Sequence, residues 1–337
     1  MTEVTEVHAV YKNIIEDFVV KDAKNQLARL KHSRQKLHLA DVSAFALNRL
    51  QPLYTTTFYG WMHQRWHAIR DFSEDISAAV SHAIANLEHA NPLHDVNCLG
   101  AYELDSKAYI LVRLSHLLGK SDLQWQEIPA ALEMAIELKR QRTELNVSIA
   151  NRHLVDELKS YLERSKPKIG DRKSATNLAP NPPQTIEQTE MESYLLKAKL
   201  GISNVMERMV ETTAIHLMRN LPPEAKDRAQ FMEVVAFALN RLPPLYATTE
   251  RGYQMLYQKA VGELFEEVTL FTQEAISRVK SSPNSDSVPF YLYRCERRID
   301  QEILPKLQQI LNRSDLTWQN LVQAVEAAID PSIEIER

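Results

Sequence analysis

The chain has 337 residues, a net charge of −4 and only 7 glycines, where average usage would give about 25. So few glycines exclude a glycine-rich phosphate loop and a dinucleotide-binding turn, because both need glycines where the backbone approaches a ligand. The slightly acidic balance argues against a general nucleic-acid-binding surface, and an apolar fraction of 44% with 25% charged residues is typical of a soluble globular protein.

Every element that we expect along the chain is a helix. Apolar residues follow a 3.6-residue period over 9–31, and a short apolar helix over 42–50, with Asp41 as its N-cap, stops before Pro52. A threonine-rich turn then leads past Gly60 into one long helix over about 61–90, and further helices follow. No segment shows the alternation that predicts a sheet.

The second half of the chain repeats the first. NIIEDFV (13–19) recurs as NVMERMV (204–210), and AFALNRLQPLYTTTFYGW (44–61) recurs as AFALNRLPPLYATTERGY (236–253). SDLQWQEIPAALEMAIE (121–137) recurs as SDLTWQNLVQAVEAAID (314–330). Three blocks in the same order indicate duplication of a whole domain, because a spacing near 192 residues far exceeds the period of solenoid repeats.

The repeat predicts two homologous all-α helical-bundle domains in tandem. We expect the first domain at 1–165 and the second at 190–337, where a long helix over 253–280 corresponds to the one at 61–90. The segment 166–189 contains four prolines and almost no large apolar residue. This composition favours a flexible linker between the domains.

The candidate functional residues lie in the motif that both copies share. Asn48 and Arg49 in the first copy, and Asn240 and Arg241 in the second, allow two interpretations. Near a helix C-terminus, asparagine can cap by taking a left-handed conformation and arginine can bind the last carbonyl groups, which would make the motif architectural. Alternatively, each guanidinium binds a phosphate or a guanine edge in a bidentate manner.

Hydroxyl and aromatic side chains follow the arginine in each copy and suit hydrogen bonding and base stacking. They are Tyr54, Thr56 and Trp61 in the first copy, and Tyr246, Thr248 and Tyr253 in the second. Arg65 lies one turn after Trp61 on the same helix face, where the second copy has Tyr257. For both aromatic residues at the helix start, half-buried packing is the alternative interpretation.

Other chemistries find little support in the sequence. His63 and His67 have a zinc-compatible spacing, but no further ligand completes the set, so we expect no metal. Cys98 and Cys295 make neither a disulfide framework nor a thiolate metal site, and no hydrolase, kinase or metalloprotease signature is present. The N-terminus lacks the features of a signal peptide and no run is long enough for a membrane span, so we expect a cytoplasmic protein.

The block N-(I/V)-(I/M)-E-x-(F/M)-V, followed by ALNRLxPLYxTTxxG, resembles the ComFB (late competence protein) family in both copies. The resemblance implies an all-α domain, frequently dimeric, without enzymatic activity and with no cofactor. Cyanobacterial members of the family look like receptors for cyclic dinucleotides, chiefly cyclic di-GMP and also cyclic di-AMP. Such receptors pass the signal to a protein partner, which for this family includes transcription regulators of the cyclic-AMP-receptor type.

Carried onto this chain, the resemblance implies that the messenger binds at the motif residues above, with neither membrane nor nucleic acid as a direct partner. The two copies would pair inside one chain as a pseudo-dimer, or the chain would form a homodimer. The alternative hypothesis is a helical scaffold for protein interaction that binds no small ligand, in which the repeated motif is purely architectural.

Overall fold

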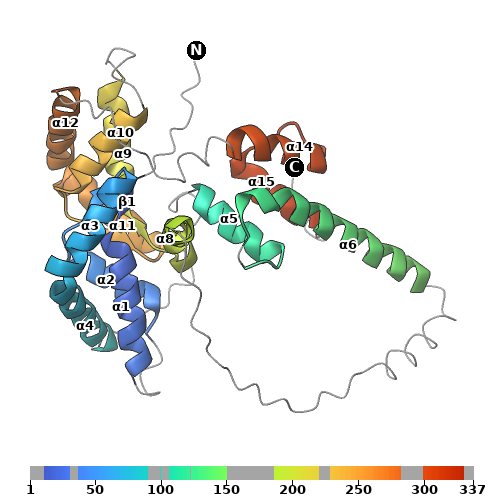
Figure 1. Ribbon diagram of the computed structural model, residues 1–337, viewed down its shortest axis with the longest axis horizontal. Helices are drawn as coiled ribbons and strands as arrows, with labels where there is room; N and C mark the ends of the chain where they lie inside the picture. Colours follow the sequence, from blue (N-terminus) through green and yellow to red (C-terminus); the bar gives the residue numbers. More distant parts are fainter. Residues whose placement is uncertain are drawn as a thin grey trace. The chain divides into compact units, whose positions relative to one another are not determined.

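The computed structural model describes residues 11–30, 37–89, 99, 106–121, 123–149, 186–219, 228–281 and 299–329. Helices make up nearly all of these ranges, which confirms the predicted all-α class (Figure 1). Contacts divide the chain into two compact units, of which the first combines 1–112 with 190–297 and the second combines 113–189 with 298–337. Each compact unit therefore takes residues from both copies of the repeat.

The predicted boundaries of the first domain (1–165), the linker (166–189) and the second domain (190–337) stay a prediction, because residues 150–185 lie outside the described ranges. One detail differs from it: helix α8 begins at Ile186, inside the predicted linker. Its last turn leads into the second copy, where Gly201 takes a φ of 66° that suits glycine.

In the first unit the two copies supply equivalent elements (Figure 1, blue for the first copy and yellow to orange for the second). The first copy forms β1 (Lys12–Asn13), α1 (Ile15–Arg29), α2 (Leu39–Leu47), β2 (Tyr54–Thr55), α3 (Phe58–Asp71) and α4 (Ser73–His89). After α8 (Ile186–Leu200), the second copy forms β3 (Ser203–Asn204), α9 (Val205–Met218), α10 (Arg228–Leu239), β4 (Tyr246–Ala247), α11 (Glu250–Glu263) and α12 (Phe265–Ser281). Helix α5 (Ser106–Leu117) spans the division between the units.

Each copy contains a two-residue antiparallel strand pair that the sequence did not predict. Lys12 pairs with Thr55 and Asn13 with Tyr54, and Ser203 and Asn204 pair in the same way with Ala247 and Tyr246. The expected helix over 9–31 therefore begins only at Ile15. These strands join the start of the domain to the loop that follows the ALNRL segment, so they bring the two repeated blocks of each copy together.

The short helix before this loop also begins earlier than expected. Helix α2 starts at Leu39 after His38, so Asp41 lies in the first turn and is not the N-cap. A carboxylate there still favours the helix through its dipole. Thr57 caps the next helix, since its hydroxyl accepts a hydrogen bond from the N–H of Gly60 at 3.1 Å. A Cβ on Gly60 would collide with the Thr55 hydroxyl, which explains the glycine.

The long helices expected at 61–90 and 253–280 are each broken in two. Phe72 and Leu264 end one helix and start the next, with backbone φ near −117° and ψ near 0°. Each of these residues donates its N–H backwards and accepts a hydrogen bond at its carbonyl from the following helix. The break turns α4 so that Ile76, Val80 and Ala83 enter the core against α1 and α2.

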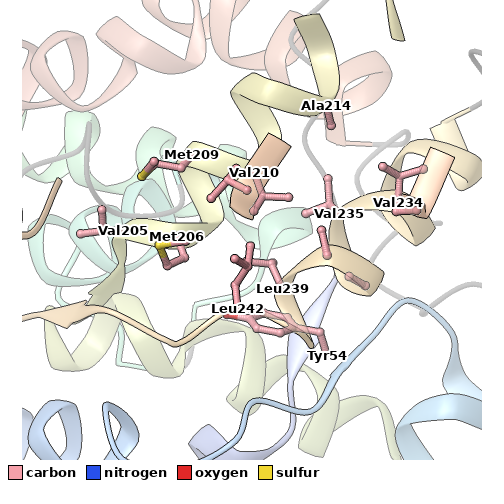
Figure 2. Packing of buried hydrophobic residues seen from close by; sticks show 14 of the residues in the cluster. Tyr54, Val205, Met206, Met209, Val210, Ala214, Val234, Val235, Leu239 and Leu242 are labelled. Atoms are coloured by element: carbon pink, nitrogen blue, oxygen red, sulfur yellow. The ribbon is translucent and has the colours of Figure 1, made fainter. Parts of the chain in front are cut away.

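Each of the two hydrophobic cores in the first unit contains a tyrosine from the other copy, and we call these two residues the exchanged tyrosines. Tyr54 of the first copy packs among residues of the second copy that include Val205, Leu239 and Leu242 (Figure 2). Tyr246 of the second copy packs correspondingly in the first copy's core. Because a tyrosine buries a large apolar area, this exchange fixes the two copies against each other.

The second unit contains the 3₁₀-helix η2 (Trp125–Glu127), α6 (Ile128–Ile149), the short π-helix η4 (Ile299–Ile303), α14 (Leu304–Leu311) and α15 (Trp318–Ile329). Trp125 and Trp318, which occupy equivalent positions in the repeat, meet edge to face with ring centroids 5.3 Å apart. In the described part of the chain, no helix has the length and apolar character needed to cross a membrane.

Candidate functional site

The repeated asparagines join the two copies. The Asn48 side chain accepts a hydrogen bond from the Tyr246 N–H at 2.5 Å and donates one to the Tyr246 carbonyl at 3.1 Å. Asn240 makes the same two contacts with the Tyr54 backbone, at 2.6 and 2.9 Å. Each side-chain amide therefore makes the two hydrogen bonds that a neighbouring strand would make, and pairs the backbone N–H and carbonyl of one tyrosine in the other copy. Asn48 has φ −66°, so it does not cap in the left-handed conformation.

The tyrosine hydroxyls end in a polar network inside the same interface. Tyr54 donates to Glu207 at 2.7 Å and accepts from the Asn204 amide at 3.0 Å. Tyr246 donates to Glu16 at 2.6 Å and accepts from the Asn13 amide at 3.0 Å. Burial, reinforced by the nearby glutamates, raises the pKa of both tyrosines well above the usual value. Both hydroxyls therefore act as fixed donors.

Charged groups surround this network. Burial raises the pKa of Glu16 to about 7, a shift that the positive charge of Lys197 opposes and the negative charge of Glu207 reinforces. Lys197 pairs with Glu207 at 2.7 Å. Burial likewise lowers the pKa of Lys12, whose ammonium lies 3.9 Å from the Asp17 carboxylate.

Asp17 connects the network to Arg65, one of the predicted ligand residues. The Arg65 guanidinium donates to Asp17 at 3.1 Å and lies 4.8 Å from the centroid of the Trp61 ring and 5.2 Å from that of Phe18. Ser193 of α8 also donates to the Asp17 carboxylate. Arg65 is therefore already neutralised by a partner in this structure.

The arginines of the shared motif lie at the surface. Arg49 donates to the Phe45 carbonyl at 3.0 Å, and its guanidinium carbon lies 3.6 Å from the centroid of the Phe45 ring. Arg241 repeats this arrangement on Phe237, with a hydrogen bond of 3.2 Å and a distance of 3.5 Å. The architectural interpretation correctly predicted the carbonyl contact. Within the described residues, this contact uses one of the five N–H donors of each guanidinium, and the other four make no hydrogen bond.

The remaining predicted ligand residues differ in access. Thr56 and Thr248 are half-buried, and the neighbouring Thr57 and Thr249 cap the following helices. Trp61 and Tyr253 are each only 3% exposed, so packing occupies their rings and no open stacking face remains in this conformation. Of the predicted set, the structure presents Arg49 and Arg241 openly to solvent and places Asn48, Asn240, Tyr54 and Tyr246 between the copies.

A metal centre has no geometric support among the described residues, where no group of three or more His, Cys, Asp or Glu side chains is arranged to hold an ion. His63 is exposed, and His67 pairs with Asp71 through its Nδ1 atom. Cys98 and Cys295 lie outside the described residues.

Sequence reasoning missed the acidic and amide members of the interface network, namely Asn13, Glu16, Asn204 and Glu207. A signal for them was present, because the repeated block NIIEDFV and NVMERMV keeps asparagine and glutamate at the same two positions. The block indicated the repeat, but nothing in it showed that its polar residues have partners 150 to 233 residues away.

These features define a duplicated all-α protein whose two copies pair within one chain through exchanged tyrosines and reciprocal asparagine contacts. Residues 12–91 and 203–283 each match the model of the family described as late competence development protein ComFB. The chain therefore contains two tandem regions that match this family model, and both belong to the first compact unit. No curated protein and no solved structure matched the chain.

Proposed function

We propose that this protein is a cytoplasmic, non-enzymatic receptor for a cyclic dinucleotide, with cyclic di-GMP as the first candidate and cyclic di-AMP as the second. Binding would be signalled to a protein partner, for which a transcription regulator of the cyclic-AMP-receptor type is our candidate. The tandem ComFB match and the motif resemblance support the proposal.

The observation that carries the proposal is that one exposed guanidinium in each copy is fixed in position by its neighbours. Arg49 and Arg241 are each fixed by a ring beneath and a carbonyl beside them, and neither has a carboxylate of the described residues within 4.0 Å. A fixed and unneutralised guanidinium loses little conformational entropy on binding and suits the phosphates or guanine edges of the messenger. Each copy therefore offers one such group to a phosphate or a guanine edge of the messenger.

A second candidate function has its own support. Because Asn48, Asn240 and both tyrosines of the motif are used between the copies, much of the repeated motif is architectural. A helical scaffold that binds no small ligand would need only these contacts. Under this alternative, Arg49 and Arg241 serve as helix caps and nothing more.

Calorimetry against cyclic di-GMP, cyclic di-AMP and GMP separates the two functions. A receptor binds a cyclic dinucleotide, and at 100 times its Kd the ligand stabilises the folded protein by about 2.7 kcal/mol. The double variant Arg49→Ala with Arg241→Ala should bind far more weakly, and lysine at both positions should restore little, since an ammonium lacks the planar fork.

The scaffold alternative gives the opposite pattern. It predicts no binding by the wild type and a lower melting temperature for the double variant, because two helix caps are lost. A double variant that binds cyclic di-GMP with wild-type affinity would remove both arginines from the proposed site. Arg251→Ala, an equally exposed arginine on α11, is the matched control.

A further inference from the structure

A second arginine lies over the aromatic ring that holds Arg241. Arg278 of α12 has its guanidinium carbon 5.1 Å from the centroid of the Phe237 ring, where Arg241 lies at 3.5 Å. These distances put the two guanidinium carbons within about 9 Å of each other, about one Debye length at physiological salt. Both side chains are exposed, while Phe237 packs against the core of the second copy.

Among the described residues, no carboxylate pairs with either of these two cations. Within the described residues, neither Arg241 nor Arg278 has a carboxylate oxygen within 4.0 Å. Glu274 precedes Arg278 by one turn of α12, a spacing that often gives an ion pair, but the two side chains form none here. Arg278 instead lies over Phe237 of α10, and no carboxylate in the described part of the chain offsets the mutual repulsion of the two guanidiniums.

The first copy lacks the second arginine. The position of Arg278 is occupied there by Asn86, whose amide donates to the His82 carbonyl of its own helix at 2.8 Å. The imidazole of His82 lies 6.0 Å from the Phe45 ring that holds Arg49, so a histidine takes the place beside the ring. Among the described residues, one permanent cation therefore lies at the Phe45 ring of the first copy and two lie at the Phe237 ring of the second.

We propose that Arg241 and Arg278 form a binding pair for a phosphate group, which makes the second copy the tighter of the two sites. The identity of the natural ligand, the phosphodiester of a cyclic dinucleotide, rests on the function proposed above. Free pyrophosphate shares this chemistry: its anionic oxygens accept hydrogen bonds from both guanidiniums and relieve their repulsion. Phe237 holds the two cations in place, so little reorganisation accompanies binding.

The anion site is tested first without the messenger. In the full-length protein, the Nε–Hε NMR signals of Arg241 and Arg278 should shift together on titration with pyrophosphate, at about tenfold lower concentration than the signal of Arg49. Arg278→Asn places the residue of the first copy in the second. In this variant, the Arg241 signal should shift only at the pyrophosphate concentration that shifts the Arg49 signal. Equal responses of Arg49 and Arg241 in the wild type would overturn the proposal.

Calorimetry with cyclic di-GMP then tests the inequality of the two copies. Arg278→Asn should weaken the tighter site about tenfold and reduce its salt dependence, whereas Arg251→Asn should change neither. Asn86→Arg should strengthen the weaker site. Messenger binding that is unaffected by both exchanges refutes the arginine pair and leaves the receptor function intact.

Pyrophosphate binding at the pair without any binding of a cyclic dinucleotide refutes the receptor function and retains the anion site. Absence of both kinds of binding refutes both proposals.

Discussion

Replacing Asn240 with alanine should lower the free energy of unfolding by roughly 2–4 kcal/mol, since two backbone groups lose their partners at once. The Asn240 side chain accepts from the Tyr54 N–H at 2.6 Å and donates to the Tyr54 carbonyl at 2.9 Å. Tyr54 is 3% exposed, so solvent reaches these groups poorly when the amide is gone. Each unsatisfied buried group costs about 1–3 kcal/mol, and partial entry of water keeps the sum below the maximum.

Urea unfolding followed by circular dichroism measures this loss, and a melting temperature lower by roughly 4–16 °C is expected for a body of this size. Asn48→Ala should lose a similar amount, because Asn48 makes the equivalent contacts with Tyr246. Asn86→Ala, which removes only an exposed contact within one helix, is the control and should stay within about 0.5 kcal/mol of the wild type. A loss for Asn240→Ala no greater than this control would refute the bridging role.

Three further expectations concern the interior. Burial raises the pKa of Glu16 to about 7 from 4.5, so its contribution to stability is present below pH 4.5 and is lost as the pH rises through 7. Glu16→Gln should therefore gain stability over the wild type between pH 5 and pH 8, on the order of 3 kcal/mol in urea titrations, and a difference independent of pH would contradict this. Gly60→Ala should lower the melting temperature clearly, whereas Gly252→Ala should change it little, because only the first new Cβ collides with a threonine hydroxyl of the preceding strand. Trp125→Ala should destabilise the second unit by about 3–5 kcal/mol and the half-buried Trp318→Ala by less, as judged by urea unfolding, and equal losses would count against the burial argument.

The helical class and the duplication were predictable because both depend on patterns that are visible along the chain. The carbonyl contact of Arg49 was also among the predicted interpretations, since the last turn of its own helix supplies the acceptor. This contact can be predicted from the local sequence, because its donor and acceptor are only four residues apart in one helix.

The interface between the copies was not predictable in this way. Asn48 and Tyr246 are 198 residues apart, and no spacing rule connects them. Tyr54 was expected to face a ligand, but it fills the core of the other copy. The helix break at Phe72 was also missed, since neither proline nor glycine marks it, and the acidic first turn of α4 is its local signal.

Covalent linkage of the paired copies has a consequence for how this protein can diverge. In an assembly of two identical chains, every substitution appears on both sides of the axis, so a residue harmful on one side cannot be kept on the other. Here the two sides are encoded separately, and their association is intramolecular and independent of protein concentration. The two copies already differ at equivalent positions, where Arg278 corresponds to Asn86 and Arg65 corresponds to Tyr257. The exchanged tyrosines, by contrast, are the same in both copies. Specialisation of one side therefore needs no change in the architecture that joins them.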